Sequence, residues 1–239
     1  MLPSARRRWR APVVISAAAA LAAAPIAVAP AVAAPEDPAT IQILDINDFH
    51  GRIQESGSVL AGAVDAERDA DVDDTVFVSA GDNIGASTFT SFSQEDEPTI
   101  DVLNAMDLQV SAVGNHEFDR GLADLTGRVA DLADFPYLGA NVYEAGTDTP
   151  ALQEFEVVVT ESGLRIGFVG VVTQQTPSLV TPSGIAGLTF GDPAEALSRV
   201  AEQLKDDDAA DIVVGLVHEG ATTSFASDDS AEEIGRAHV

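Results

Sequence analysis

Apolar residues along the chain follow two spacings, one typical of β-strands and one typical of helices. Alternating or short continuous apolar runs predict strands, and recurrence every three to four residues predicts helices. Leu122, Leu125, Val129 and Leu132 show the helical spacing clearly. We expect strands over residues 41–47, 75–79, 109–113, 136–141, 155–159, 165–172 and 212–217, and helices over residues 59–68, 99–106, 122–132 and 192–204.

The order of these segments predicts an α/β domain. Strands alternate with helices, a pattern that places helices outside one or more sheets. Segments 155–159 and 165–172, joined through Glu161-Ser162-Gly163, predict an antiparallel hairpin within this alternation. Asp192 is the expected N-cap of the last helix, with Pro193 at its first position. A long polar loop is expected over residues 81–98.

Clusters of acidic residues and histidine directly follow four of the predicted strands. In chain order they are Asp48-Phe49-His50-Gly51, Gly81-Asp82-Asn83, Gly114-Asn115-His116-Glu117 and His218-Glu219-Gly220. Three of the chain's four histidines fall inside them. Because ligands of α/β sheets gather beyond the carboxyl ends of strands, we expect these side chains to meet at one edge of a sheet.

The residue types in these clusters indicate a metal site. Singly, each has an ordinary explanation as a turn aspartate, a surface histidine or a core histidine. Together they offer carboxylate, amide and imidazole ligands, which suit Zn²⁺, Mn²⁺ or Mg²⁺. Asp48 and His50 are two residues apart, so in extended backbone both would project to the same side and could hold one cation. An aspartate shared between two divalent ions would hold them roughly 3.5–4 Å apart.

Composition narrows the classes of partner and of ligand. The absence of cysteine excludes disulfides and thiolate ligands. Residues 1–34 contain four of the twelve basic residues and no acidic residue, so the remainder holds 8 basic and 39 acidic residues, a formal charge of −31. A surface this acidic disfavours sequence-independent or sequence-specific nucleic-acid binding, whereas a small anionic substrate could still bind beside metal ions.

The first 34 residues have the layout of a secretory signal peptide. Arg6, Arg7, Arg8 and Arg10 form a positive segment, an apolar stretch runs over residues 11–28, and small residues precede Pro35. Prolines at positions 12, 25 and 30 argue against a transmembrane anchor in this stretch. We therefore expect export, a secreted or cell-surface protein, and no transmembrane segment in the mature chain.

The last six residues, 234–239, read Ile-Gly-Arg-Ala-His-Val. Their reverse translation, ATC GGA AGA GCA CAC GTC, matches the start of a widely used sequencing-adapter sequence. We expect these six residues to be foreign, with a natural C-terminus as the alternative, and His238 to carry no function.

The four clusters in this order resemble those of the calcineurin-like metallophosphoesterases, and more narrowly of the exported 5′-nucleotidase / 2′,3′-cyclic phosphodiesterase family. The block Gly114–Asp119, with the sequence GNHEFD, is the most specific part, and the resemblance covers nearly all of the chain after residue 34. It implies a sandwich of sheets flanked by helices. It also implies an exported two-metal phosphoric-ester hydrolase that acts on a small anionic nucleotide and releases nucleoside and phosphate.

The same resemblance implies the metal ligands. Asp48 and His50 would bind one ion, Asp82 would bridge both ions, and Asn115 and His218 would bind the other. His116 would face the phosphate as a catalytic group and neutralise the departing oxygen. Asp119 would pair with His116 and fix its tautomer. Asn83 flanks a ligand and could touch substrate or pack the turn, and Phe89 and Phe92 are expected to pack beneath the site.

Two parts of the family pattern have no counterpart in this sequence. One is a G-H-x-[HQ] block, some tens of residues after His218, that completes both metal sites. The other is a C-terminal domain that supplies an aromatic clamp on the base and arginines on the phosphate. We therefore expect residues 35–233 to be an incomplete catalytic domain, and this polypeptide alone to bind metal weakly and to be inactive, an expectation that concerns the fragment and not the natural protein.

Other functions remain open at this point. The same metal site could act on a cyclic-nucleotide phosphodiester, a UDP-sugar, a nucleic acid or a sulfur ester, and only the missing domain would discriminate among these. A non-catalytic surface or binding module is a further alternative. That alternative predicts broken ligand positions, whereas each ligand that this part of the family pattern requires is present.

Overall fold

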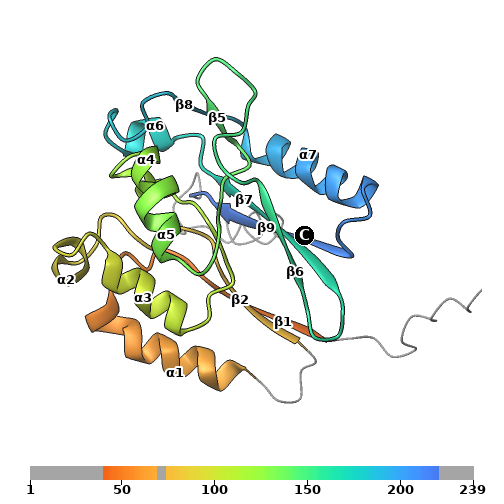
Figure 1. The fold of residues 1–239 in the computed structure, drawn as a ribbon, viewed down its shortest axis with the longest axis horizontal. Coiled ribbons are helices and arrows are strands. Elements are labelled where there is room, and N and C mark those ends of the chain that lie inside the picture. Colours follow the sequence, from red (N-terminus) through yellow and green to blue (C-terminus); the bar gives the residue numbers. More distant parts are fainter. Residues whose placement is uncertain (1–39, 69–73, 221–239) are drawn as a thin grey trace, which may run out of the picture. The chain divides into compact units, whose positions relative to one another are not determined.

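The computed structural model describes residues 40–68 and 74–220 (Figure 1). The predicted signal peptide over residues 1–34 and the foreign segment over residues 234–239 lie outside the described residues. The boundaries of the expected catalytic domain therefore stay predictions.

The strands of the described residues form three sheets. The first is entirely parallel, in the order β1 (Ile41–Ile46), β2 (Asp74–Ser79), β3 (Val110–Ala112) and β4 (Tyr137–Leu138). The second joins β6 (Phe155–Val159) antiparallel to β7 (Arg165–Val172), and β7 parallel to β9 (Ile212–His218). The third is a two-stranded antiparallel pair, β5 (Val142–Glu144) with β8 (Leu188–Phe190).

Three helices account for most of the helical residues. They are α1 (Ser58–Glu67), α3 (Glu97–Ala105) and α7 (Pro193–Asp206). Shorter pieces are η1 (Ile53–Gly57), α2 (Phe89–Phe92), η2 (His116–Phe118), α4 (Leu122–Asp124), η3 (Leu125–Val129), α5 (Ala130–Leu132) and α6 (Thr176–Leu179). None of the helices in the described ranges has both the length and the hydrophobicity that crossing a bilayer requires.

The two larger sheets pack face to face, which makes the domain a sandwich. Successive side chains of a strand point to opposite faces, so the two faces of β2 contribute to different hydrophobic clusters. Val76 and Val78 of β2 pack with Ile166 and Phe168 of β7 between the sheets. These four side chains are at most 2% exposed. Complete burial of a side chain of this size contributes about 1.5–3 kcal/mol.

Helices cover the outer faces of both sheets. Phe77, on the other face of β2, packs in one cluster with Ile100 and Leu103 of α3. On the far side of the sandwich, Val200 and Leu204 of α7 pack in the cluster that contains Val169 and Val171 of β7, two β7 residues that face away from the other sheet. Figure 1 shows α1 and α3 on one side of the sheets and α7 on the other. The predicted α/β sandwich flanked by helices is confirmed.

Three local predictions were wrong or incomplete. Residues 81–98 are not one loop, because they contain α2 and the start of α3. The helix expected over residues 122–132 is interrupted by the π-helical turn η3. Phe89 and Phe92 do not pack beneath the site, since they are 81% and 57% exposed. The reason is that α2 turns Ser91 inward, where its hydroxyl bonds Asp96 at 2.7 Å.

Candidate metal centre

The four clusters do meet at one edge of the sandwich. Because β1, β2 and β3 are parallel, the loops that follow them leave the same edge of the first sheet. The loops after β1 and β2 are joined by backbone hydrogen bonds from Asp48 N to Gly81 O at 3.1 Å and from His50 N to Asp82 O at 3.0 Å. His218 reaches this place from the end of β9 in the second sheet, and its ring bonds Ala80.

Left-handed backbone, not extended backbone, orients three of the candidate ligands. The φ angles are 54° at Asp48, 48° at His50 and 54° at Asp82. The side chains of Asp48 and His50 do converge, as predicted. The predicted cause, an extended backbone between them, was wrong. Left-handed residues other than glycine are unfavourable and cluster at functional sites, where the surrounding contacts hold them in place.

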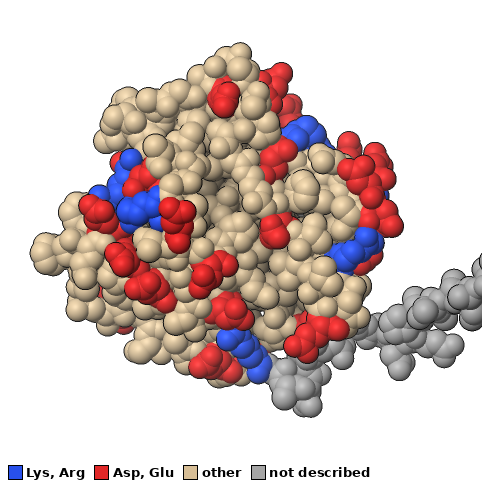
Figure 2. Space-filling model, in the orientation of Figure 1, with Lys and Arg blue, Asp and Glu red and all other residues tan. Residues whose placement is uncertain are grey.

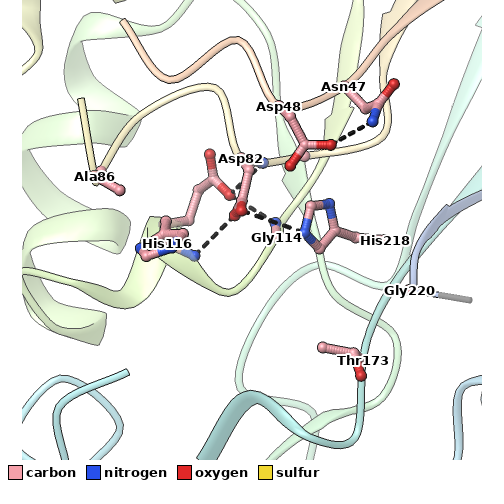
Figure 3. Close-up of polar contacts among 12 residues, drawn as sticks. Asn47, Asp48, Asp82, Ala86, Gly114, His116, Thr173, His218 and Gly220 are labelled. Atoms are coloured by element: carbon pink, nitrogen blue, oxygen red, sulfur yellow. Dashed lines mark hydrogen bonds and ion pairs between the residues drawn. The ribbon is translucent and has the colours of Figure 1, made fainter. Parts of the chain in front are cut away.

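Asp82 lies at the centre of the cluster (Figure 3). Its Oδ2 atom is 3.6 Å from Nε2 of His50 and 3.3 Å from Nε2 of His218. Asp48 contributes Oδ1 at 3.6 Å from the same His50 nitrogen. Ligand atoms of Asp48, Asp82 and His218 lie within 4.8 Å of one another, close enough to share one cation. Asp82 is buried and Asp48 lies at the exposed rim.

Both histidines present the ring nitrogen that a metal would require. Nδ1 of His50 lies 2.9 Å from the carbonyl oxygen of Gly85, and Nδ1 of His218 lies 3.0 Å from that of Ala80. A carbonyl oxygen only accepts hydrogen bonds, so each Nδ1 carries a proton and donates it. In the neutral ring the lone pair is then on Nε2, directed at Asp82. Metal-binding histidines are fixed in the same manner, by a hydrogen bond from the other ring nitrogen.

The pKa values describe the electrostatics of these groups without an ion. Burial lowers the pKa of His218, but the hydrogen bond and the charge of Asp82 outweigh burial and raise that pKa to about 9. Burial acts on Asp82 in the opposite sense, yet the hydrogen bond and charge of His218 keep the pKa of Asp82 below its usual range. A divalent cation would replace the proton on His218 and balance the carboxylates, so the donor set fits such an ion.

His116 and Asp119 form a pair beside the cluster. Nδ1 of His116 lies 3.1 Å and 3.0 Å from the two carboxylate oxygens of Asp119, and the amide of Ala86 donates to Asp119 Oδ2 at 3.0 Å. Among residues 40–68 and 74–220, no side chain or backbone group forms a hydrogen bond with Nε2 of His116. The ring stands edge-on to that of His50, with 5.2 Å between centroids. Figure 3 shows the Asp82 carboxylate between His116 and His218.

Asn115 lies three residues after the end of β3 and is buried, with 7% exposed. Its role as a ligand stays a prediction. Asn83, by contrast, packs the turn. Its Oδ1 accepts from the Ser79 hydroxyl at 2.7 Å and its Nδ2 donates to the Ser111 hydroxyl at 2.8 Å, so it connects β2 to β3 beneath the site.

Sequence reasoning assigned no role to Glu117. Its carboxylate is buried and accepts four backbone N–H groups. Oε2 accepts from Asp82 at 2.9 Å and Gly114 at 2.6 Å, and Oε1 accepts from Asn83 at 2.9 Å and Ile84 at 3.3 Å. Burial first, and then the charge of Asp82, raise the pKa of Glu117 to about 7. The only signal in the sequence was its place inside the GNHEFD block.

Comparisons with known proteins identify relatives of this chain. No family model matches the chain. Three curated relatives do: the endonuclease YhcR of Bacillus subtilis, 33% identical over 216 residues; the cell wall protein Lmo0130 of Listeria monocytogenes, 34% over 218 residues; and a 5′-nucleotidase of Vibrio vulnificus, 29% over 189 residues. The matches cover 79%, 76% and 75% of this chain, and 18%, 28% and 34% of the respective relatives. The chain thus spans about a fifth to a third of their length.

A solved structure agrees with these relatives. A Staphylococcus aureus protein with a provisional 5′-nucleotidase designation superposes with a TM-score of 0.64 at 27% identity, over 78% of this chain and 39% of that one. The chain is similar in sequence to 5′-nucleotidases and in fold to a solved structure with that designation. The resemblance drawn from the four clusters is thereby confirmed.

Proposed function

We propose that the protein is an exported, two-metal phosphoric-ester hydrolase that converts a 5′-nucleotide to nucleoside and phosphate. One observation carries this proposal: Nε2 atoms of two histidines, each oriented by a hydrogen bond from Nδ1, face the same Oδ2 atom of Asp82. Sequence similarity to 5′-nucleotidases supports the reaction class. Nucleotidase relatives support a small nucleotide as substrate.

Each candidate residue has a role in this proposal. Asp48 and His50 would hold one divalent ion, Asp82 both, and Asn115 and His218 the other. Ions bound there would polarise the phosphoryl oxygens and lower the pKa of a water molecule. The metal is Zn²⁺, Mn²⁺ or Mg²⁺, all of which accept this donor set.

His116 would act as the general acid. Protonated at Nε2, it would give its proton to the ester oxygen as the bond from that oxygen to phosphorus breaks, while water adds to phosphorus from the opposite side. The Asp119 carboxylate accepts a hydrogen bond from Nδ1 of His116, which fixes the orientation of the ring. In this proposal His116 supplies the proton, and Asp119 orients the His116 ring that carries it.

Substitution of His116 tests the mechanism. We expect His116→Ala to lower kcat for phosphate release from AMP by about 10²–10⁴-fold, the range usual for a general acid. The assay uses the complete natural protein with Mn²⁺, and Glu202→Ala, at an exposed position of α7, serves as the control with unchanged turnover. Near-normal turnover of His116→Ala would contradict the assigned role.

Endonuclease activity is the second candidate function, because the relative YhcR, which is 33% identical to this chain, is named an endonuclease. The net charge of −31 after residue 34 opposes it, since long phosphate backbones would be repelled. Parallel assays with AMP and with a short DNA duplex would decide between the two, and faster cleavage of the duplex would favour the endonuclease.

Export is supported by the composition of residues 1–34. A location outside the cell or at its surface agrees with the cell wall relative. N-terminal sequencing of protein recovered from outside the producing cell should begin at Pro35. A mature protein that still begins at Met1 would refute cleavage.

A further inference from the structure

Glu117 connects the two loops that carry most of the candidate site. Three of its four N–H donors, from Asp82, Asn83 and Ile84, lie in the loop after β2, and the fourth, from Gly114, lies in the loop after β3. A carboxylate offers about four acceptor positions on two oxygens, and here four donors fill them. The side chain is 3% exposed, so solvent has little access to replace it.

These two loops lie in direct backbone contact. A Cβ atom on Gly81 would lie 2.5 Å from the nitrogen of Gly114, and one on Gly114 would lie 2.2 Å from Oδ1 of Asp82. The amide of His116 donates to that same Oδ1 atom at 2.8 Å. The position of one loop therefore sets the position of the other, and the Asp82 carboxylate lies at their junction.

We propose that Glu117 is a positioning residue for ion binding: by accepting amides from both loops it sets the distance between the Asp82 carboxylate and the segment Asn115–His116. The inference rests on the proposed function, because it presupposes that Asp82 binds a divalent ion. A purely structural Glu117 would contribute to folding stability and leave ion affinity unchanged in the folded protein.

The change Glu117→Gln separates these two roles. Glutamine keeps the shape of the side chain but replaces one acceptor oxygen with an NH₂ donor. Either way round, two of the four amides would then face a donor in place of an acceptor. Buried amides without an acceptor are strongly unfavourable, so the two loops must move apart and carry Asp82 with them.

Asp74→Asn is the matched control. Asp74 is also a buried carboxylate, 6% exposed, and it starts β2 at the end away from the candidate site. It accepts hydrogen bonds from the backbone and the hydroxyl of Ser162. The substitution thus makes the same carboxylate-to-amide change at another buried position, without touching the loops that Glu117 joins.

The experiment is a titration of the complete natural protein with Mn²⁺, followed by the electron paramagnetic resonance signal of the free ion. Thermal unfolding in EDTA measures the stability of each variant separately. We expect Glu117→Gln to raise the Kd for Mn²⁺ by about 10–100-fold, as loss of a residue that orients ligands does. Asp74→Asn should change it by less than about threefold, whatever stability it loses.

Each other result has a defined meaning. Equal Mn²⁺ affinities in wild type and Glu117→Gln would overturn the positioning role and leave the proposed function standing. Wild-type protein that binds no Mn²⁺ would overturn the proposed function, and the inference with it. Should Glu117→Gln not fold, Glu117→Asp is measured by the same criterion, because it keeps the charge but withdraws the carboxylate by one methylene.

Discussion

At the scale of single residues, glycine makes the candidate site possible where two loops touch. A Cβ atom at position 114 would lie 2.2 Å from Oδ1 and 2.7 Å from Cγ of Asp82, far inside van der Waals contact. Gly114→Ala must therefore displace the central carboxylate. We expect the Kd for Mn²⁺ to rise at least about tenfold, the lower end of the effect of disturbing ligand orientation. Calorimetric titration of the complete natural protein measures it.

Gly62→Ala is the control for this substitution. Gly62 lies in α1, is exposed, and a Cβ atom there would meet nothing within 4 Å. Alanine in a helix interior should stabilise the protein by about 0.5–1 kcal/mol and leave Mn²⁺ binding unchanged. If Gly114→Ala binds Mn²⁺ as tightly as Gly62→Ala does, Asp82 is not the central ligand that the proposal requires.

The sequence predicted which of these side chains lie close together, but not what fixes their orientation. Asp48, His50, Asp82 and His218 stood out because they follow apolar strands. Their orientation depends on left-handed backbone and on carbonyl groups such as those of Gly85 and Ala80, which any residue type would supply. Backbone acceptors leave no mark in a sequence, and for the same reason the partners of Glu117, all backbone amides, could not be predicted.

At the scale of elements, α7 depends on a side-chain cap that was predicted. Oδ1 of Asp192 accepts from the amides of Ala194 at 2.8 Å and Glu195 at 3.0 Å. Asp192→Ala leaves both amides without this acceptor and should lower the free energy of unfolding by about 1 kcal/mol. For a domain of this size the melting temperature should fall by about 2–4 °C.

The opposite end of α7 supplies the control. Asp206 is exposed, and its negative charge opposes the helix dipole at the C-terminus. Asp206→Ala should therefore leave the melting temperature unchanged or raise it slightly. Both variants are followed by circular dichroism at 222 nm. An equal fall in both would mean that the loss at Asp192 reflects surface charge and not capping.

Elements with strong local signals were predicted, and elements made by distant pairing were not. Segment 192–204 has a cap, a first-turn proline and helical spacing, and it forms α7. β5 and β8 have three residues each, and Val142 pairs with Phe190, 48 positions later in the chain. Strands this short carry too few alternating positions to be distinguished from loop. Likewise α2 contains two exposed phenylalanines and a buried serine, the reverse of the usual helix pattern.

At the scale of the whole molecule, the charge balance dominates. After residue 34 the chain holds 39 acidic and 8 basic residues, and Figure 2 shows groups of acidic side chains scattered over the visible face. Like charges at this density repel one another in the compact state. Because salt screens exposed charges, folding stability should increase with ionic strength. We expect the melting temperature to rise by at least about 2 °C between roughly 0.01 M and 0.15 M NaCl.

Screening must be separated from ion binding at the candidate metal site. All samples contain EDTA, and NaCl is compared with KCl and tetramethylammonium chloride at equal ionic strength. Screening depends on ionic strength and not on the kind of monovalent cation, so the three salts should give the same rise. A site that selects one cation would separate the three curves. A melting temperature that falls with salt would mean that attraction between opposite charges, such as the pairs Arg165–Asp211 and Arg199–Glu154, outweighs repulsion in the folded protein.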